Sequence, residues 1–113
     1  MAAAFYRLDN LISFVDRNFV QIDGPTEKVM ALEPLADKWQ AFGWNVILCN
    51  GHDHSDVISA AERAKQTSGR PTVIIAHTIM SKGVKSIEGD YLWHGKPPAK
   101  DQVAGFLQEL YEG

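Results

Sequence analysis

Three short apolar runs alternate with segments of helical periodicity, and this alternation limits the fold more than any other feature of the sequence. The runs span residues 11–15, 45–49 and 72–76, and each contains β-branched or aromatic side chains. Such runs are typical of strands buried on both faces of a sheet. Strands joined by single helices pair in parallel through right-handed crossovers. The sequence therefore predicts an α/β fold: an open parallel sheet with helices on both faces.

The first connecting helix has clear ends. Pro34 is expected at its first position and Gly43 just beyond its last turn, with Leu35, Trp39 and Phe42 on one apolar stripe. This spacing predicts an amphipathic helix that packs on one face of the sheet.

The rest of the chain supplies two more helices and a long loop. A turn at residues 51–53 leads into the second helix, with Asp53 near its start, and Asp101 is expected to cap a final amphipathic helix. Residues 82–98 hold three glycines and two prolines without a sustained period, so they are expected to form a loop. A loop of that length in a compact domain is usually functional.

Bulk properties narrow the class of protein. At 113 residues the chain is expected to form one domain, and its net charge of -3, without a basic cluster, argues against nucleic acid or a membrane surface as partner. A single cysteine, Cys49, fits a reducing compartment. The first residues do not resemble a signal peptide. We therefore expect a cytoplasmic location and no membrane insertion.

Residues 16–24, Asp-Arg-Asn-Phe-Val-Gln-Ile-Asp-Gly, follow the first apolar run and place an amide, Asn18, at the tip of the predicted strand. An Asn side chain can offer a neutral oxygen to a hard cation, and a backbone carbonyl two residues further on can point the same way. The alternative is that Asn18 only satisfies local backbone groups in a turn. The histidines have no spacing that indicates a zinc site.

With Leu-Asp-Asn-Leu at residues 8–11 and Trp-His-Gly-Lys-Pro at 93–97, this stretch resembles the amino-terminal, thiamine-diphosphate-binding region of transketolases. The resemblance spans 1–113 and implies one partial thiamine-diphosphate-binding domain with 82–98 as a functional loop. It implies that Mg²⁺ is bound by the Asn18 side chain and the Val20 carbonyl, together with an Asp from a Gly-Asp-Gly turn. Phe19 stands where the family usually has Gly.

The resemblance also implies cofactor contacts for three further residues. Ile22 corresponds to a position that packs against the thiamine ring system, although it could equally be a core residue. Met80 corresponds to a position that faces the cofactor, although a methionine that merely fills space is at least as expected, and Ser81 replaces the usual Gly. His94 corresponds to the histidine that contacts the diphosphate and reaches toward the sugar, as a catalytic residue. Gly95 would permit a close backbone approach.

The implied reaction is the transfer of a two-carbon ketol unit between sugar phosphates, as in the pentose phosphate pathway, with Mg²⁺ and thiamine diphosphate as cofactors. The Gly-Asp-Gly turn does not occur in these residues. The activating glutamate and the pyrimidine-binding domain are also expected to come from elsewhere. We therefore expect a split subunit that is inactive alone, is active only with partner chains and is oligomeric. The alternatives are a non-catalytic remnant or interaction module, and a sugar-phosphate-binding module without thiamine.

Overall fold

A computed structural model describes residues 1–112, which divide into two compact units. The sheet unit comprises residues 1–17 and 32–78, and the loop unit comprises residues 18–31 and 79–112. No helix within the described residues is long and apolar enough to cross a membrane.

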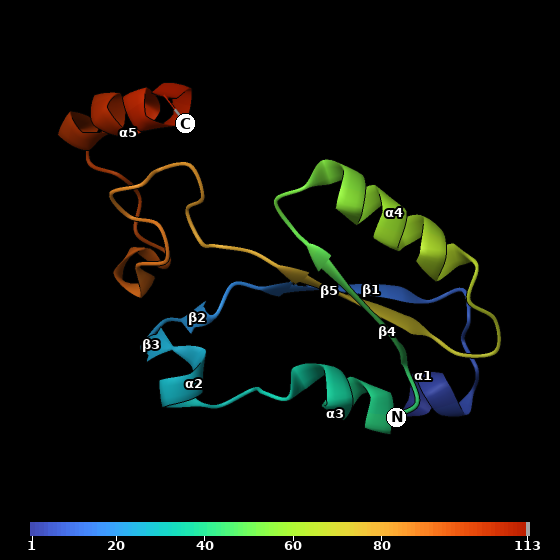
Figure 1. Cartoon of the computed structure of the whole chain (residues 1–113). Coiled ribbons are helices and arrows are strands. Elements are labelled where there is room, and N and C mark those ends of the chain that lie inside the picture. The colour runs from blue at the N-terminus through green and yellow to red at the C-terminus, as the bar shows by residue number, and fades with distance from the viewer. Residues whose placement is uncertain (113) are drawn as a thin grey trace. The chain divides into compact units, whose positions relative to one another are not determined.

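The sheet unit contains three parallel strands, β1 (Ile12–Arg17), β4 (Asn45–Asn50) and β5 (Thr72–His77), in the spatial order β1-β5-β4 (Figure 1). Thr72 is aligned with the first residue of both neighbouring strands, and His77 is aligned with the last residue of both. All three strands therefore end at the same edge. The predicted parallel α/β sheet is confirmed.

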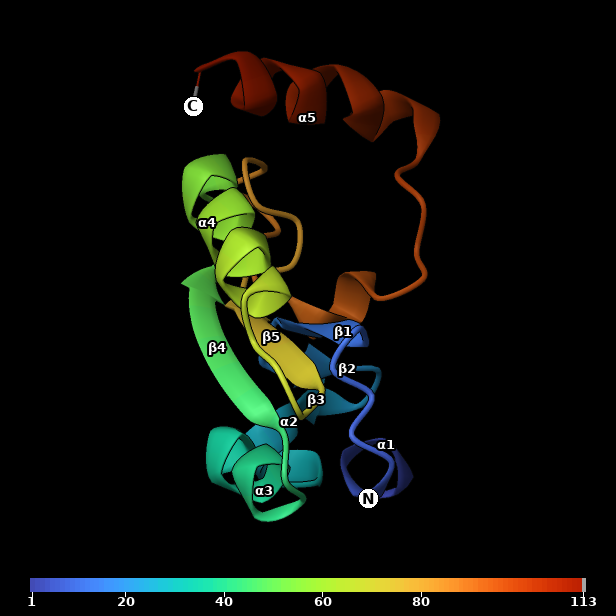
Figure 2. The same cartoon turned by 90° about the vertical axis from the view of Figure 1, so that its right-hand side faces the viewer.

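Helices cover both faces of this sheet (Figures 1 and 2). Helix α4 (His54–Lys65) packs on one face, where its fully buried Ala60 and Ala64 meet strand residues such as Ile74. Helices α1 (Ala2–Phe5) and α3 (Leu35–Ala41) contribute to the core on the other face, around the edge-to-face pair Trp39 and Trp44. Small residues let α4 approach closely, so the middle strand β5 is almost completely buried.

The first strand differs from the prediction. It covers Ile12–Arg17 instead of 11–15, and it is not buried on both faces, because the Phe14 side chain is 54% exposed. The reason is that β1 is an edge strand and α4 packs mainly over β4 and β5. An apolar run indicates that the strand is suited to burial. It does not indicate whether other elements of this chain cover both faces of the strand.

The loop unit begins with a small hairpin of β2 (Val20–Gln21) and β3 (Gly24–Pro25), followed by α2 (Thr26–Val29). A two-residue turn at Ile22 and Asp23 joins the two strands. The short strands were not expected, because two residues carry no readable periodicity.

The remaining part of the loop unit holds the short 3-10 helix η1 (Tyr91–Trp93) and helix α5 (Lys100–Glu112). Asp101 does not cap α5, because the helix begins one residue earlier and the Ala99 amide donates to the Gln102 side chain at 3.0 Å. Loop and helix are joined where the Ser86 amide donates to Glu109 at 2.9 Å.

Candidate functional site

Asn18 directly follows the last residue of β1, and its side chain is half-buried. Its Oδ1 accepts a hydrogen bond from the Val20 amide at 3.1 Å. The local turn role that an Asn can play is therefore present. An amide oxygen has two lone pairs, so this bond leaves Oδ1 able to accept a second partner. The local role and a ligand role are compatible.

The backbone of Val20 points its polar groups toward the same side as Asn18. Val20 is aligned with Pro25 in the antiparallel pair β2–β3, and the preceding pair is hydrogen-bonded, because the Thr26 amide donates to the Phe19 carbonyl at 2.9 Å. Bonded and non-bonded pairs alternate in such a ladder, and Pro25 has no N–H to donate. The Val20 carbonyl is therefore directed away from β3, toward the outer edge where its own amide meets Asn18 Oδ1.

The residue between these two oxygens has a left-handed backbone. Phe19 has φ +64°, and its carbonyl also accepts from the Thr26 hydroxyl at 3.3 Å. Ser81 has φ +60°. A residue with a Cβ gives up about 1–2 kcal/mol in this region, which glycine does not. Both positions where the chain departs from the usual glycine thus keep a backbone that glycine would favour.

Ile22 lies in the turn of the hairpin and is 65% exposed. It is not a core residue of this chain, so the alternative of simple core packing is wrong. An exposed isoleucine in this turn is available for contact with an apolar group.

His94 follows η1 directly and is exposed, with its amide donating to the Tyr91 carbonyl at 3.0 Å. The helix η1 contacts β3, which places the beginning of the His94 loop beside the hairpin. Gly95 has φ +70° and open space where a Cβ would lie. Glycine therefore suits the backbone conformation at this position, and within residues 1–112 no close approach to its potential Cβ explains it.

Met80 is half-buried, and its carbonyl accepts from the Gly89 amide at 2.9 Å. Among residues 1–112, no recorded hydrogen bond joins the side chain of His94 or the backbone of Met80 to Asn18. The structure thus brings Asn18, Val20 and Ile22 together on one hairpin. It places Met80 and His94 in the same unit without a direct link to them.

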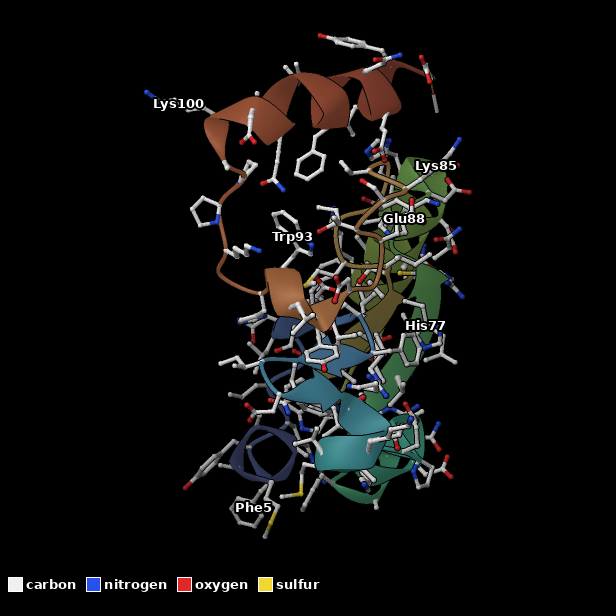
Figure 3. All side chains as sticks on the ribbon, turned by 90° about the vertical axis from the view of Figure 1, so that its left-hand side faces the viewer. Phe5, His77, Lys85, Glu88, Trp93 and Lys100 are labelled. Carbon is white, nitrogen blue, oxygen red and sulfur yellow. The ribbon has the colours of Figure 1, made fainter. Side chains whose placement is uncertain are left out.

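The His94 loop is held against α5 by aromatic packing. The rings of Trp93 and Phe106 meet edge to face at 5.4 Å, and Figure 3 shows Trp93 on the side of its loop nearest α5. The Lys96 ammonium lies 4.4 Å from the Trp93 ring centroid. Lys82 and Glu88 form an ion pair at 3.3 Å, and Glu88 also accepts from the Gly83 amide. These contacts define the loop before any ligand binds.

Two supporting residues were not identified from the sequence. Thr26 fixes the Phe19 carbonyl, and Glu88 fixes the turn that follows Met80. A Thr at the start of a short helix is a readable signal for a backbone contact. No signal in the sequence marks Glu88, because its partners depend on the path of an irregular loop.

The donor set fits magnesium as a partial site. Asn18 Oδ1 and the Val20 carbonyl are neutral hard oxygens, which Mg²⁺ accepts together with phosphate and water oxygens. Within residues 1–112, no group of three or more His, Cys, Asp and Glu side chains could hold a metal ion. The described chain therefore offers oxygen ligands at one edge of a hairpin and no carboxylate cluster beside them.

Comparison with known proteins identifies the family of this chain. The family described as "Transketolase, thiamine diphosphate binding domain" matches residues 1–111. Among curated relatives, one of the subunits of the apulose-4-phosphate transketolase of Phocaeicola vulgatus is 41% identical over 112 residues, 99% of this chain and 40% of that protein. The 6-deoxy-6-sulfo-D-fructose transketolase subunit SqwG of a Clostridium species is 42% identical over 97% of this chain and 40% of its own length.

Solved structures lead to the same fold. Transketolase from Campylobacter jejuni superposes with a TM-score of 0.74 at 33% identity, over 80% of this chain and 14% of that chain. Transketolase from Leishmania mexicana gives a TM-score of 0.76 over 98% of this chain and 20% of its own, and at 24% identity it shows the fold alone. The chain spans about two-fifths of the length of the two curated relatives. It belongs to the transketolase family, within the thiamine-diphosphate-binding domain.

Proposed function

We propose that this chain is part of a transketolase that transfers a two-carbon ketol unit between sugar phosphates, and that it supplies part of the Mg²⁺ and diphosphate site. The observation that carries the proposal is that Asn18 Oδ1 and the Val20 carbonyl lie on the same outer edge of one hairpin. Thiamine diphosphate supplies the stabilised carbanion in this chemistry, and the protein supplies binding and orientation.

Asn18 and Val20 would provide two oxygens to the metal. Mg²⁺ requires near-octahedral oxygen ligands, so the others come from diphosphate, water and a group outside this chain. The hydrogen bond from the Val20 amide holds Asn18 Oδ1 beside the Val20 backbone at 3.1 Å. Because both ligands are fixed before the metal arrives, binding does not have to order them.

The other predicted contacts complete the proposal. Ile22 would pack against the thiamine ring system, and the exposed position of its side chain supports this. His94 would donate a hydrogen bond to the diphosphate and reach toward the sugar. Its side chain is exposed, and its loop is held in place by the packing of Trp93 against Phe106, which supports this role. Met80 would border the cofactor through its half-buried side chain.

The proposal requires partner chains. Two neutral oxygens complete only part of the near-octahedral ligand set of Mg²⁺, which in proteins usually includes a carboxylate. Two relatives are named as transketolase subunits, which supports assembly with chains that carry the Gly-Asp-Gly segment and the pyrimidine-binding domain. By itself the chain would bind thiamine diphosphate weakly and show no transketolase activity.

The test is calorimetry of Mg²⁺ and thiamine diphosphate binding to a complex of this chain with a chain carrying the Gly-Asp-Gly segment. Asn18→Ala is the test variant. Asn50→Ala is the matched control, because Asn50 also ends a parallel strand and its Oδ1 accepts from an amide two residues on, that of His52, at 3.0 Å. The two variants lose the same kind of turn bond, but only one loses the proposed ligand.

We expect Asn18→Ala to raise the Mg²⁺ concentration needed for cofactor binding by roughly tenfold or more, since loss of a group that only supports a metal ligand already costs about 10–100-fold. Asn50→Ala should bind as the unaltered chain does. Equal binding by all three forms would refute the metal role of Asn18. Sugar phosphate binding that needs no thiamine diphosphate would favour the sugar-phosphate-binding module instead.

A further inference from the structure

Asn50 ends β4, and it is the one asparagine of the chain that is followed by a glycine. The other asparagines precede Leu11, Phe19 and Val46. The backbone nitrogen of the residue after an asparagine can attack the side-chain amide carbon, and a Cβ on the attacking residue hinders this approach. Gly51 has no Cβ. Among the asparagines of this chain, Asn50 therefore has the least steric hindrance to attack by the backbone.

The Asn50 side chain is exposed and folds back over the Gly51 peptide. Its Oδ1 accepts from the His52 amide at 3.0 Å, so a ring closes from the side chain through the Gly51 backbone. This Asx turn holds the amide carbon Cγ of Asn50 close to the Gly51 peptide. Because the side chain is exposed, water can reach it and a released group can leave.

The Gly51 nitrogen, in contrast, is occupied. Its N–H donates to the His77 carbonyl at 2.8 Å, which joins the end of β4 to the end of β5. This nitrogen can attack only after it has lost its proton, and a proton held by a carbonyl is lost mainly when the structure opens locally. Thr78 and Ala76 pack against Gly51, since a Cβ there would lie 2.4 Å and 3.2 Å from their side-chain carbons. The packed end of the sheet therefore restrains the attacking nitrogen, while the side chain that it would attack is accessible.

From these observations we infer that Asn50 is a site of spontaneous deamidation, and that the hydrogen bond from Gly51 to His77 controls its rate. When this end of the sheet opens, the Gly51 nitrogen loses its proton and bonds to Cγ of Asn50, and the side-chain nitrogen leaves as ammonia. Water then opens the resulting succinimide at either carbonyl carbon. One product is aspartate, and the other is isoaspartate, in which the main chain runs through the former side chain.

Both products would change the end of the sheet. Each carries a new carboxylate near that of Asp56, which already accepts from the Asn50 amide at 2.8 Å, and like charges at close range repel one another. Isoaspartate also lengthens the main chain by a methylene group, so Gly51 could not keep both its bond to His77 and its packing against Thr78. The modification would therefore loosen the edge at which the three parallel strands end.

The experiment compares the full chain in its folded form with the chain in guanidinium chloride, at the same pH and temperature, by peptide mapping with mass spectrometry. In the denatured chain we expect Asn50 to deamidate about tenfold or more faster than Asn10, Asn18 and Asn45, because only Gly51 lacks a Cβ. In the folded chain Asn50 should react about tenfold or more slowly than in the denatured chain. Isoaspartate in the Asn50 peptide identifies the succinimide route, since direct hydrolysis of the side chain gives only aspartate.

Amide hydrogen exchange of Gly51 tests what controls the rate. Exchange and attack both require the same N–H to be released from His77, so the factor by which folding slows deamidation should match the exchange protection of Gly51 within about threefold.

Two matched variants test the same control from the other side of the turn. Asp56→Asn and Asp56→Ala both remove the charge, but only Asp56→Ala leaves the Asn50 amide without this acceptor. We expect the folded Asp56→Ala chain to deamidate at Asn50 about threefold or more faster than the folded Asp56→Asn chain, because its turn opens more often. In guanidinium chloride the two variants should react alike. Circular dichroism verifies that each variant folds.

Several results would overturn the inference. These are equal rates at Asn50 in the folded and denatured chain, faster deamidation at Asn10, Asn18 or Asn45 than at Asn50 after denaturation, or a slowing that does not follow the protection of Gly51. Aspartate without isoaspartate would mean direct hydrolysis and would remove the role of Gly51. None of these measurements involves metal, cofactor or a partner chain, so the deamidation site can fail while the proposed function stands.

Discussion

A methyl group at Gly51 would collide with the end of β5. A Cβ at this position would lie 2.4 Å from Cγ2 of Thr78, 3.1 Å from the His77 carbonyl oxygen and 3.2 Å from the Ala76 Cβ. Carbon atoms in optimal contact are separated by about 3.5–4.0 Å, so the first contact overlaps by more than an ångström. The Gly51 backbone cannot retreat freely, because its amide donates to the His77 carbonyl at 2.8 Å.

We expect Gly51→Ala to lower the free energy of unfolding by about 1–3 kcal/mol, the usual cost of overpacking. Thr78→Ser should relieve most of this cost, because it removes Cγ2 and keeps the hydroxyl that donates to the Asp16 carboxylate. In the Thr78→Ser background, the alanine should cost about 1 kcal/mol or less. The coupling energy between the two substitutions should then be roughly 1–2 kcal/mol, within the range for residues in contact.

Urea denaturation followed by circular dichroism measures all four forms. Gly69→Ala is the control, because Gly69 has φ +73° and no atom within 4 Å of its potential Cβ. Its cost should come from backbone conformation alone and should not change with Thr78→Ser. Additive effects of Gly51→Ala and Thr78→Ser would show that steric contact between these residues does not control the end of the sheet.

Three further predictions concern the core, the loss of stability at acid pH and the loop that carries His94. Ile74 is fully buried in β5, so Ile74→Ala should lower the free energy of unfolding by about 2–5 kcal/mol and Ile74→Val by about 0.5–1.5 kcal/mol in the same urea titration; equal effects would contradict this packing. The pKa of Glu33 is lowered, first by the hydrogen bond from the Leu35 amide and then by the buried Arg17. A lowered folded-state pKa contributes stability that is complete above the unfolded-state pKa and is lost as the pH falls through the folded-state value. The Glu33→Gln variant should therefore be less stable than the unaltered chain near neutral pH, and its free energy of unfolding should fall less on acidification. An unchanged fall in the free energy of unfolding at low pH would refute this. In the assembled enzyme, His94→Ala should lower kcat on the order of a hundredfold at saturating cofactor, as expected for one donor that acts in the transition state; full turnover would leave the loop with a structural role only.

The sheet could be predicted because each of its strands is a run of mostly apolar residues, which indicates burial. Residues 73–76 are apolar throughout and lie buried in the middle strand. The run that becomes β1 looks the same in the sequence, yet Phe14 is left half-exposed. Apolar character alone cannot distinguish a buried middle strand from a partly exposed edge strand.

The candidate site was predictable to a similar extent. Asn18 and Val20 were predicted as metal ligands from the family resemblance, and that role stays a prediction. The neighbouring hairpin depends on contacts that no periodicity reveals, above all the bond from the Thr26 amide to the Phe19 carbonyl. The left-handed backbone at Phe19 and Ser81 could not be predicted from the residue types either, because residues with these side chains rarely adopt a positive φ. Ile22 was ambiguous between core and contact surface until its exposure was known.

The most direct test of the central claim is to replace Mg²⁺ with paramagnetic Mn²⁺ in the complex with a Gly-Asp-Gly-carrying chain and thiamine diphosphate. The readout is broadening of backbone amide signals in the NMR spectrum of this chain. If Asn18 and Val20 bind the metal, the signals of Asn18, Phe19 and Val20 broaden first, and Asn18→Ala reduces this broadening while Asn50→Ala does not. Sharp signals from these residues in a complex saturated with metal and cofactor would contradict the metal site.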